Sequence, residues 1–590
     1  TMNVTSTGET FNLSTTNIDM TGEKGAHQLV PHGLQNLNWT GLGGGQYAAM
    51  KLVGGQEINI NDVTINYTGT GSSQFRRWLF HTDGHNDNGD STWNINAGTK
   101  INMNGKNLVM YSSQYHGSGN YNVVMTNSGT ITTSATGSSN YVWLPISDGN
   151  WGGFRMMVFE NKGKITLNGL KDGLSFYGSE GDNVGGISFI NNGTIELNGI
   201  ESKGIIVKDD KKYTSGEILL NNPIKITGDK AVGLAFLGYI DLEGGKPSHH
   251  SGANNVIVEL PATTRTSILK VDMQNNKKAT ALYFENKGAT PFVLKDFNLT
   301  STNGKNNTLV FVKNGIVNMN SATNADGTLK SALKITGGES NIGIYTEAAG
   351  KALSNNAPIS ISNSNSSTGI FAKSSGAVTN TGEVSASGKS VKAIITQGST
   401  INSTGKVTVN GTALSDSDGA VGLASMNGGT LTQNNADTNI TVDGSASIGA
   451  YADGKVGIPA SVTTKLNITG GKITATGGAF NIYSANKGEV NLSGVTTETG
   501  PKSLAFYTDG GKINFAGTTT AKIKGGSDSN SRGTAFLYKN TSGTYAPFNT
   551  TTISAWVGNN FGNMSNLTLN MEAGSRLFIA QNVHMDLTGT

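Results

Sequence analysis

Hydrophobic and polar residues alternate in a short motif that recurs along the chain. The motif is Gly-x-[Ile/Val]-x-apolar-x-Gly. Its copies are GKITLNG at 163–169, GTIELNG at 193–199, GEVSASG at 382–388, GKVTVNG at 405–411, GKITATG at 471–477, GEVNLSG at 488–494 and GKINFAG at 511–517. Within a copy, Ile165 and Leu167 point to one side and Thr166 points to the other. This alternation predicts strands with one buried face, and the bracketing glycines supply corners with positive φ.

A second motif, a short apolar run opened by a small residue, often begins 10 or 11 residues after the first. Its copies are GLSFYG from Gly173, GIIVKD from Gly204, GLAFLG from Gly233, GIYTEA from Gly343, GIFAKS from Gly369, AIITQG from Ala393, GLASMN from Gly422 and GAYADG from Gly449, with the related NIYSAN from Asn481 and AFLYKN from Ala535. Copies from Gly343 to Gly449 lie 24 to 29 residues apart. Two or three short strands with turns in that length form one coil of a parallel β-helix.

The predicted fold class is therefore all-β: a right-handed parallel β-helix, or β-solenoid, with loop decorations mainly near the N-terminus. One coil cannot bury its apolar side chains alone, but stacked coils place Ile on Ile and pair every strand above and below. A set of β-sandwiches is the alternative, but sandwiches do not repeat one strand motif so often. We expect very little helix.

Composition supports a narrow core rather than several compact domains. The 590 residues include 81 Gly and 10 Pro, with only 35% hydrophobic and 14% charged residues. A low apolar fraction is typical of disorder, but disorder usually comes with high charge, which this chain lacks. A quasi-one-dimensional fold needs few hydrophobic residues per coil.

Charge and cysteine content exclude several classes of function. The net charge is +3 with no basic stripe, so we expect no nucleic-acid partner. The absence of Cys excludes a disulfide framework and Cys-ligated zinc. No apolar run approaches the ~18 residues of a membrane-spanning helix. The chain begins at Thr1 without a signal-peptide pattern, so we expect any such peptide to have been removed or never to have been part of this sequence.

We divide the chain into three regions. Residues 1–160 form an irregular, aromatic-rich N-terminal solenoid that holds five of the six Trp and five of the eight His. Residues 161–545 form regular coils, with an extra coil or an insertion at about 238–275. Residues 546–590 are expected to continue the β-helix and to stop without a cap, as a fragment of a longer protein would.

These Gly- and Asn-rich coils resemble the passenger of type V autotransporters. The strands of the first motif, together with runs such as GIYTE and GIFAK, resemble the very large fusobacterial adhesins of this class, among them an arginine-inhibitable adhesin and its galactose-binding relatives. The resemblance covers nearly the whole chain, more firmly from residue 160 onward. It implies a cell-surface, outer-membrane location, with membrane contact only through a C-terminal β-barrel that this sequence does not include. It also implies partners among surface proteins or glycans of other bacteria or host cells, with host immune receptors among them.

Few motifs in the sequence indicate a metal site or a catalytic site. HTDGH at 81–85 places His81, Asp83 and His85 on one strand face, which suits a metal, but a polar turn is the simpler interpretation. Paired acids occur at Asp209/Asp210 and Asp416/Asp418, and some β-helix enzymes cleave polysaccharides with acids on one strand face. Asp416 and Asp418 lie in SDSDG, a loop composition that no Arg or Lys accompanies in register. We predict no catalytic residues, no metal and no cofactor.

An aromatic and basic cluster in the N-terminal region is the predicted recognition site. The predicted ligand-binding residues share large aromatic or cationic side chains: Arg76, Arg77, Trp78, His81, Trp93, Tyr115, Trp143 and Trp151. Such side chains dominate binding hot spots, and the two arginines could grip carboxylates of an acidic partner. The alternative is that these rings form a small core beneath a loop.

The sequence thus predicts a non-enzymatic adhesin that attaches to other bacteria or host cells through protein or glycan ligands. Two alternatives remain: a polysaccharide-active β-helix enzyme, and a passive stalk that presents a binding tip located elsewhere. Within the adhesin hypothesis, a further possibility is that the regular coils, rather than residues 1–160, carry the ligand surface.

Overall fold

The three-dimensional description comes from a computed structural model of the chain. It describes residues 9–14, 18–20, 26–29, 34–40, 48–53, 57–71, 77–85, 91–116, 122–147, 156–179, 186–241, 267–286, 291–347, 352–454, 462–540, 544 and 546–585. In these ranges the chain forms 56 β-strands, one α-helix and one 3-10 turn. The strands pair in parallel, each with the strand at the same position of the next coil, so the predicted parallel β-helix is confirmed.

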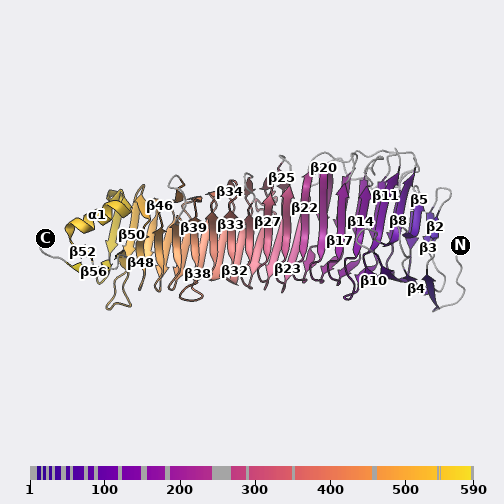
Figure 1. Cartoon of the computed structure of the whole chain (residues 1–590), viewed down its shortest axis with the longest axis horizontal. Helices are drawn as coiled ribbons and strands as arrows, with labels where there is room; N and C mark the ends of the chain where they lie inside the picture. Colours follow the sequence, from indigo (N-terminus) through magenta and orange to yellow (C-terminus); the bar gives the residue numbers. More distant parts are fainter. Residues whose placement is uncertain are drawn as a thin grey trace. The chain divides into compact units, whose positions relative to one another are not determined.

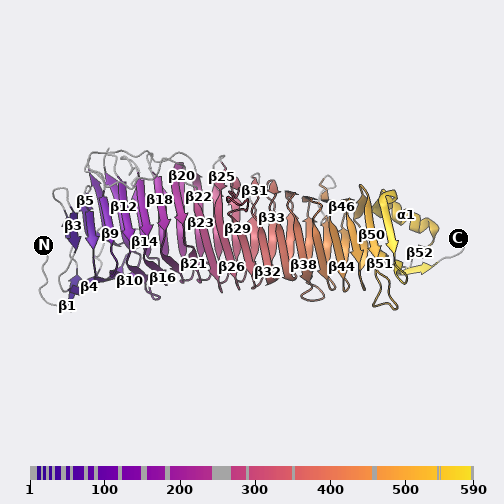
Figure 2. The ribbon, with the colours of Figure 1, turned by 180° about the vertical axis from the view of Figure 1, so that it is seen from behind.

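The coils fall into two units, which we describe separately: residues 1–300 with 321–330, and residues 301–320 with 331–590. Equivalent strands of successive coils form three stacks, named A, B and C. Figure 1 labels several B strands of the second unit, including β33 and β39, and Figure 2 shows the A strands β32, β38 and β44 in succession.

In unit 1 the strands of all three stacks pair from coil to coil. Stack A comprises β1 (Glu9–Ser14), β4 (Leu34–Thr40), β7 (Thr64–Thr70), β10 (Lys100–Lys106), β13 (Thr130–Thr133), β16 (Lys164–Leu167), β19 (Thr194–Leu197), β21 (Ile224–Ile226) and β23 (Ile268–Gln274). Stack B comprises β2 (Ile18–Met20), β5 (Ala48–Val53), β8 (Arg77–His85), β11 (Leu108–His116), β14 (Tyr141–Ser147), β17 (Gly173–Ser179), β20 (Lys203–Leu220), β22 (Val232–Asp241) and β24 (Thr280–Asn286). Stack C comprises β3 (Ala26–Leu29), β6 (Glu57–Ile60), β9 (Ser91–Ile95), β12 (Asn122–Asn127), β15 (Met156–Asn161), β18 (Gly186–Asn191) and the second half of β20. A further short strand is β25 (Phe292–Leu294), and β26 (Asp296–Thr302) crosses the unit boundary in sequence.

Unit 2 repeats the three-stack plan with more even coils. Stack A comprises β29 (Ala332–Thr336), β32 (Ile359–Asn365), β35 (Val384–Lys389), β38 (Val407–Thr412), β41 (Asn439–Asp443), β44 (Lys472–Thr476), β47 (Thr496–Thr499), β50 (Thr519–Ile523) and β54 (Leu567–Met571). Stack B comprises β27 (Thr308–Asn314), β30 (Ile342–Thr346), β33 (Thr368–Lys373), β36 (Lys392–Gln397), β39 (Val421–Met426), β42 (Ile448–Asp453), β45 (Phe480–Ala485), β48 (Leu504–Asp509), β51 (Thr534–Lys539) and β55 (Arg576–Gln581). Stack C comprises β28 (Val317–Met319), β31 (Leu353–Asn355), β34 (Val378–Asn380), β37 (Thr400–Ser403), β40 (Thr430–Asn434), β43 (Thr464–Thr469), β46 (Gly488–Ser493), β49 (Lys512–Phe515) and β53 (Phe561–Gly562). The remaining elements are α1 (Thr550–Asn560), the 3-10 turn η1 (Met564–Asn566), and the paired strands β52 (Ala546–Phe548) and β56 (Val583–Met585).

The first sequence motif forms strands of stacks A and C, with the predicted residues inside. Ile165 and Leu167 are fully buried, whereas Thr166 between them is partly exposed. Five of the copies form stack A strands, and the two copies at 488–494 and 511–517 form β46 and β49 of stack C. The motif therefore marks a strand with one buried face rather than one fixed position in the coil.

The second motif forms stack B, and its opening glycine has a steric cause. A Cβ at Gly343 would lie 2.6 Å from the carbonyl oxygen of Gly369 and 2.9 Å from Ile359 Cγ2. Gly343 and Ile344 are both buried in succession, so the alternation slips by one residue. Tyr345, the next residue, therefore faces outward.

Polar residues inside the coil satisfy one another between coils. In unit 1, the buried Asn127 donates its amide to Asn161 Oδ1 at 2.8 Å, and Asn161 donates to Asn191 Oδ1 at 2.8 Å. At another corner, the backbone N–H of Asn140 donates to Asp172 Oδ1 at 2.9 Å. Burial raises the pKa of Asp172, while hydrogen bonds from Thr133, Asn140 and Gly169 oppose that rise.

Two regions differ from simple repetition. The 48-residue spacing after Gly233 is one long coil rather than an extra coil, because β22 pairs directly with β24. Residues 242–266 of the expected insertion at 238–275 lie outside the described residues.

The last region was expected to hold only coils, but the helix α1 occurs there between β52 and β53. Asn549 and Thr552 form a reciprocal capping box at its start. The described part of the chain has no helix of the length and apolarity needed to cross a bilayer.

The buried asparagine ladder gives a stability prediction. Asn161→Ala would leave a buried amide donor on Asn127 and a buried acceptor on Asn191 without partners. We expect a loss of about 2–4 kcal/mol in the free energy of unfolding of unit 1. The measurement is the urea midpoint followed by tryptophan fluorescence. The control Asn192→Ala removes an exposed neighbour and should change the midpoint little; equal effects of the two changes would contradict the role of the ladder.

Candidate functional site

Two tryptophans of the predicted recognition site lie in the core of unit 1. Trp93 is 0% exposed, packs against Phe80 with ring centroids 5.0 Å apart, and donates Nε1–H to Thr82 Oγ1 at 2.9 Å. Trp143 is 2% exposed and stacks on Phe159 at 5.5 Å. These side chains fill the coil interior and do not face a ligand.

Trp78 and His81 are also buried, in a second cluster. Their rings stack with centroids 4.5 Å apart, and each side chain is 4% exposed. Trp78 packs in a cluster with Val109, Tyr141 and Leu144. Trp78, His81, Trp93 and Trp143 are thus buried, as in the alternative in which these rings form a core, because large apolar rings gain more from burial than from exposure.

The other predicted residues cannot be placed as a site. Arg76 and Trp151 lie outside the described residues. Arg77 and Tyr115 belong to β8 and β11, but their side chains are outside the described part. The side chains of Asp83 and His85 in HTDGH are outside it as well, and among the described residues no three His, Asp or Glu side chains gather to hold a metal.

The acid pair Asp416/Asp418 has a basic partner that the sequence analysis excluded. The side chains of the other pair, Asp209/Asp210, lie outside the described residues. Lys392, one coil before Asp418, brings Nζ to 3.8 Å from Asp418 Oδ1, so the statement that no Lys accompanies this acid is wrong. Asp416 is exposed and accepts a hydrogen bond from Ser445 at 2.6 Å.

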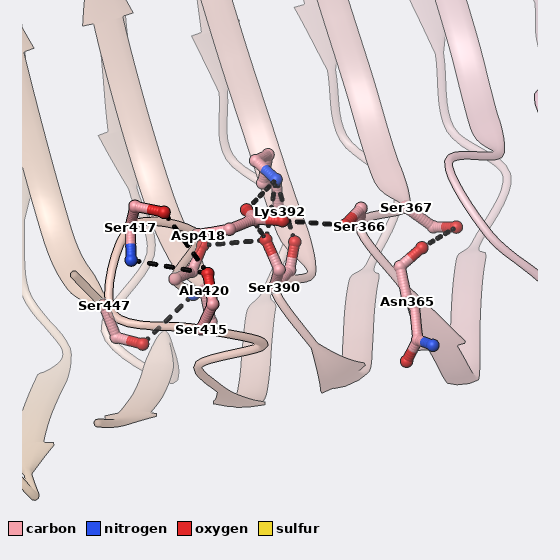
Figure 3. Close-up of polar contacts among 11 residues, drawn as sticks. Asn365, Ser366, Ser367, Ser390, Lys392, Ser415, Ser417, Asp418, Ala420 and Ser447 are labelled. Carbon is pink, nitrogen blue, oxygen red and sulfur yellow. Dashed lines mark hydrogen bonds and ion pairs between the residues drawn. The ribbon is translucent and has the colours of Figure 1, made fainter. Parts of the chain in front are cut away.

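Asp418 is the centre of a polar cluster at the corner of three coils (Figure 3). Ser366 Oγ donates to Asp418 Oδ2 at 3.2 Å, and Ser390 Oγ donates to Oδ1. Lys392 Nζ donates to the carbonyl oxygen of Ser390 at 2.9 Å. Burial lowers the pKa of Lys392, and the charge of Asp418 opposes this. Because Ser390 is fully buried, its hydroxyl cannot reach a substrate. The cluster therefore stabilises the contact between successive coils at this corner.

The outward side of stack B in unit 2 carries the feature that could bind a partner. We call it the aromatic face, and its rings are Phe311, Tyr345, Phe371, Tyr451, Phe480, Tyr483 and Tyr507. Six of these rings are partly exposed, and Tyr507 is 7% exposed. They come from two groups of strands that pair in register, β27, β30 and β33 in one and β42, β45 and β48 in the other, with β36 and β39 between the groups.

Rings of the aromatic face contact one another from coil to coil. Tyr345 lies between Phe311 and Phe371, with centroids 5.0 Å and 5.5 Å away and ring planes tilted by 37° and 36°. Tyr483 lies between Tyr451, which is tilted by 37° at 5.1 Å, and Tyr507, which stacks on it at 4.8 Å. Because each ring partly covers the face of its neighbour, edges and hydroxyls make up much of what the rings offer to solvent.

Carboxylates accompany several of these tyrosines two residues later. Tyr345 donates its hydroxyl to Glu347 Oε2 at 2.8 Å, and Tyr451 donates to Asp453 Oδ2 at 2.7 Å. Burial, followed by the contact with Glu347, raises the pKa of Tyr345 to about 12. Burial and nearby charges raise the pKa values of Tyr451, Tyr483 and Tyr507 as well. The hydroxyls therefore stay protonated at physiological pH.

The other two outward sides of unit 2 are polar. Stack A presents Ser360, Ser385, Thr408, Asn439, Lys472 and Thr496 in one column. Stack C presents an asparagine ladder in which Asn514 donates to Asn491 at 3.0 Å and Asn491 donates to Asn467 at 2.9 Å. Only the stack B side of the described coils of unit 2 combines rings with charged neighbours.

Sequence reasoning missed the aromatic face, although a signal existed. The second motif has Tyr or Phe at its third position in GIY, GIF, GAY and NIY, and an acid two residues later in YTE and YAD. Strict alternation from the opening glycine would place that ring inside. The slip at Gly343 and Ile344 turns it outward.

The protonated tyrosines give a prediction at alkaline pH. Their folded pKa values lie above the unfolded value of about 10, so their contribution to the stability of unit 2 is present below that pH and is lost as pH rises through the folded values. In folded protein, phenolate absorbance should include a late component that appears only above about pH 12 or on unfolding. Changing Tyr451, Tyr483 and Tyr507 together to Phe should reduce it.

The control is protein unfolded in urea, in which all tyrosines should ionise near pH 10. Complete ionisation of the folded protein near that pH, with the coil signal in circular dichroism intact, would contradict the burial of these hydroxyls.

Comparisons with known proteins supply no identity. A scan of family models, a search of curated proteins and a search of solved structures each found no match to this chain. The aromatic face and the Asp418 corner therefore have to be interpreted from their own residues.

Proposed function

We propose that this chain is a non-enzymatic adhesion protein of the bacterial cell surface, and that it attaches to other bacteria or to host cells through the aromatic face. The observation that carries the proposal is the contrast between sides: two sides of unit 2 bear mainly small polar residues, whereas one bears seven rings. Exposed aromatic rings grouped on one side of a protein are typical of interaction surfaces. The resemblance to autotransporter passengers in the coil motifs supports the same function and location.

The geometry favours an extended, flat partner. Ring faces within the ladder are partly covered by neighbouring rings, so a sugar has few fully open faces on which to stack. Edges and hydroxyls spread over successive coils instead suit a broad protein surface or a long polymer. Among the ligands expected from sequence, we therefore propose surface proteins ahead of single glycans.

The aromatic face gives a binding prediction. In the full chain, Tyr451→Ser combined with Tyr483→Ser should weaken attachment to bacterial or epithelial cells about tenfold or more, because aromatic residues dominate hot spots. Attachment is measured with labelled protein on whole cells and on a glycan array. The matched control is Thr441→Ala combined with Thr474→Ala on the outward side of stack A, which should bind as the parent does.

The competing location is the N-terminal region. If Arg76→Ala with Arg77→Ala abolished attachment while the tyrosine variant bound normally, the aromatic face would not be the adhesive surface. Normal circular dichroism of each variant excludes loss of fold as the cause.

The enzyme alternative predicts a different result. Asp418 is held by Ser366, Ser390 and Lys392, and we expect no new reducing ends when the chain is incubated with a panel of polysaccharides. Release of reducing ends that Asp418→Asn removes would favour the enzyme instead.

A further inference from the structure

Two outward columns of stack B in unit 2 are arranged symmetrically about the space between β36 and β39. The ring column reads Phe311, Tyr345, Phe371, Ile395, Ala424, Tyr451, Tyr483 and Tyr507 along the coils. Three rings precede the Ile395–Ala424 centre and three follow it. The order in this column is therefore close to a palindrome, with one ring per coil on either side; Phe480, the seventh ring of the aromatic face, lies in a different column of β45.

A second column, two residues further along the strands, carries charges. Its charges are opposite in sign at equal distances from the centre. In it, Lys373 lies one coil before the central pair β36 and β39, and Asp453 lies one coil after that pair. At the outer coils, Lys313 of β27 and Asp509 of β48 follow directly after the last paired residues, Val312 and Thr508, and so continue the same column. Each lysine thus has an aspartate at the same number of coils on the other side of the centre. The remaining charged residue of the column, Glu347, has an alanine of β45 at its counterpart position.

We propose that the aromatic face binds a second copy of this chain in an antiparallel, two-fold symmetric dimer. The axis lies in the plane of the face, along the strands, between β36 and β39. Rotation by 180° about this axis reverses the order of the coils. Each column of one copy then faces the same column of the second copy, read in the opposite direction. This inference rests on the proposed function, because it names the partner of the same face.

The rotation brings opposite charges together. Lys373 meets Asp453 of the second copy, and Lys313 meets its Asp509, so every such contact forms twice. A two-fold axis along the coil stack would instead keep the coil order, reverse the strands and set the charged column against a different column. Charge complementarity within the column therefore favours the antiparallel arrangement.

The centre of the face is a shallow position between the two groups of rings. Ile395 is 9% exposed and Ala424 is 2% exposed, so neighbouring side chains of the same chain already cover most of both, and the contact with a second copy is made mainly by the rings and charged residues on either side. Lys392, on the same side of β36, turns its ammonium group to Ser390 and Asp418. Its charge is thereby compensated within its own corner, and its methylene groups can pack against an apolar partner.

The area is sufficient for a specific complex. Eight coils spaced by ~4.8 Å and about five residues of each strand cover roughly 600 Å² per copy. Roughly 1,200 Å² in total is the lower end for stable, specific interfaces. The same contact between chains on two cells would join the cells.

Charge reversal tests the dimer in the full chain. We expect sedimentation equilibrium to show a dimer, and Lys373→Glu to raise its dissociation constant about tenfold or more, because two attractive contacts become repulsive. Asp453→Lys should do the same. The control Lys389→Glu makes the same charge change on the outward side of stack A and should dimerise as the parent does.

Mixing the two weakened variants is the decisive experiment. In a mixed dimer, the glutamate introduced by Lys373→Glu in one copy meets the lysine introduced by Asp453→Lys in the other. The unchanged Asp453 of the first copy and the unchanged Lys373 of the second also pair. We therefore expect the mixture of the two proteins to form heterodimers, which also shows that both variants are folded.

Three outcomes would overturn the inference: a monomer at concentrations up to about 100 μM, a dimer that Lys373→Glu leaves unchanged, or two weakened variants that fail to pair on mixing. Attachment to other cells is measured separately on the same proteins. A monomer that still attaches through the tyrosines would refute the dimer and leave the proposed function standing. A dimer that attaches to no bacterial or host cell would support the inference and refute the proposed function.

Discussion

The structure depends on contact between equivalent residues of successive coils. Parallel strands satisfy their backbone groups only in the neighbouring coil, and side chains at one position meet their counterparts at the strand spacing. Asn161 shows what this demands inside, since each of its neighbours at the same corner is another asparagine that completes its hydrogen bonds. Tyr483 shows the same rule outside, where the rings before and after it contact its ring. Stability and surface pattern therefore share one cause.

Much of the fold could be predicted because equivalent positions of successive coils need similar residues, which produces a repeat in the sequence. Inward residues such as Ile165 and Leu167 alternate with polar ones, and their spacing gives both the strand and the coil. Two features escaped this reasoning. The α-helix at 550–560 has a Thr-rich start typical of strands, and the reciprocal cap between Asn549 and Thr552 decides its conformation locally. The slip at Gly343 depends on a close approach between coils that no alternation encodes.

The candidate site was harder to predict because residue type does not determine burial. Trp93 and Trp143 were expected to recognise a ligand, yet they fill the interior of unit 1, where Thr82 accepts the indole hydrogen bond of Trp93. The aromatic content of the N-terminal region thus reflects a core with larger side chains. The link between Lys392 and Asp418 was missed for a related reason: residues 26 positions apart in sequence become neighbours only when the coil register is known.

A solenoid that must stay soluble gains from small polar residues on its surface, and stacks A and C of unit 2 follow that rule with Ser, Thr and Asn. Stack B departs from it over many coils, so the departure cannot be attributed to one strained position. Ring contacts between coils lower the cost of exposing tyrosines, because each ring partly covers the face of the next. What remains exposed is a row of edges with charges beside it, fixed at the spacing of the coils. Such a surface matches a partner with the same spacing better than it matches a small ligand, and another copy of the same solenoid has that spacing by construction.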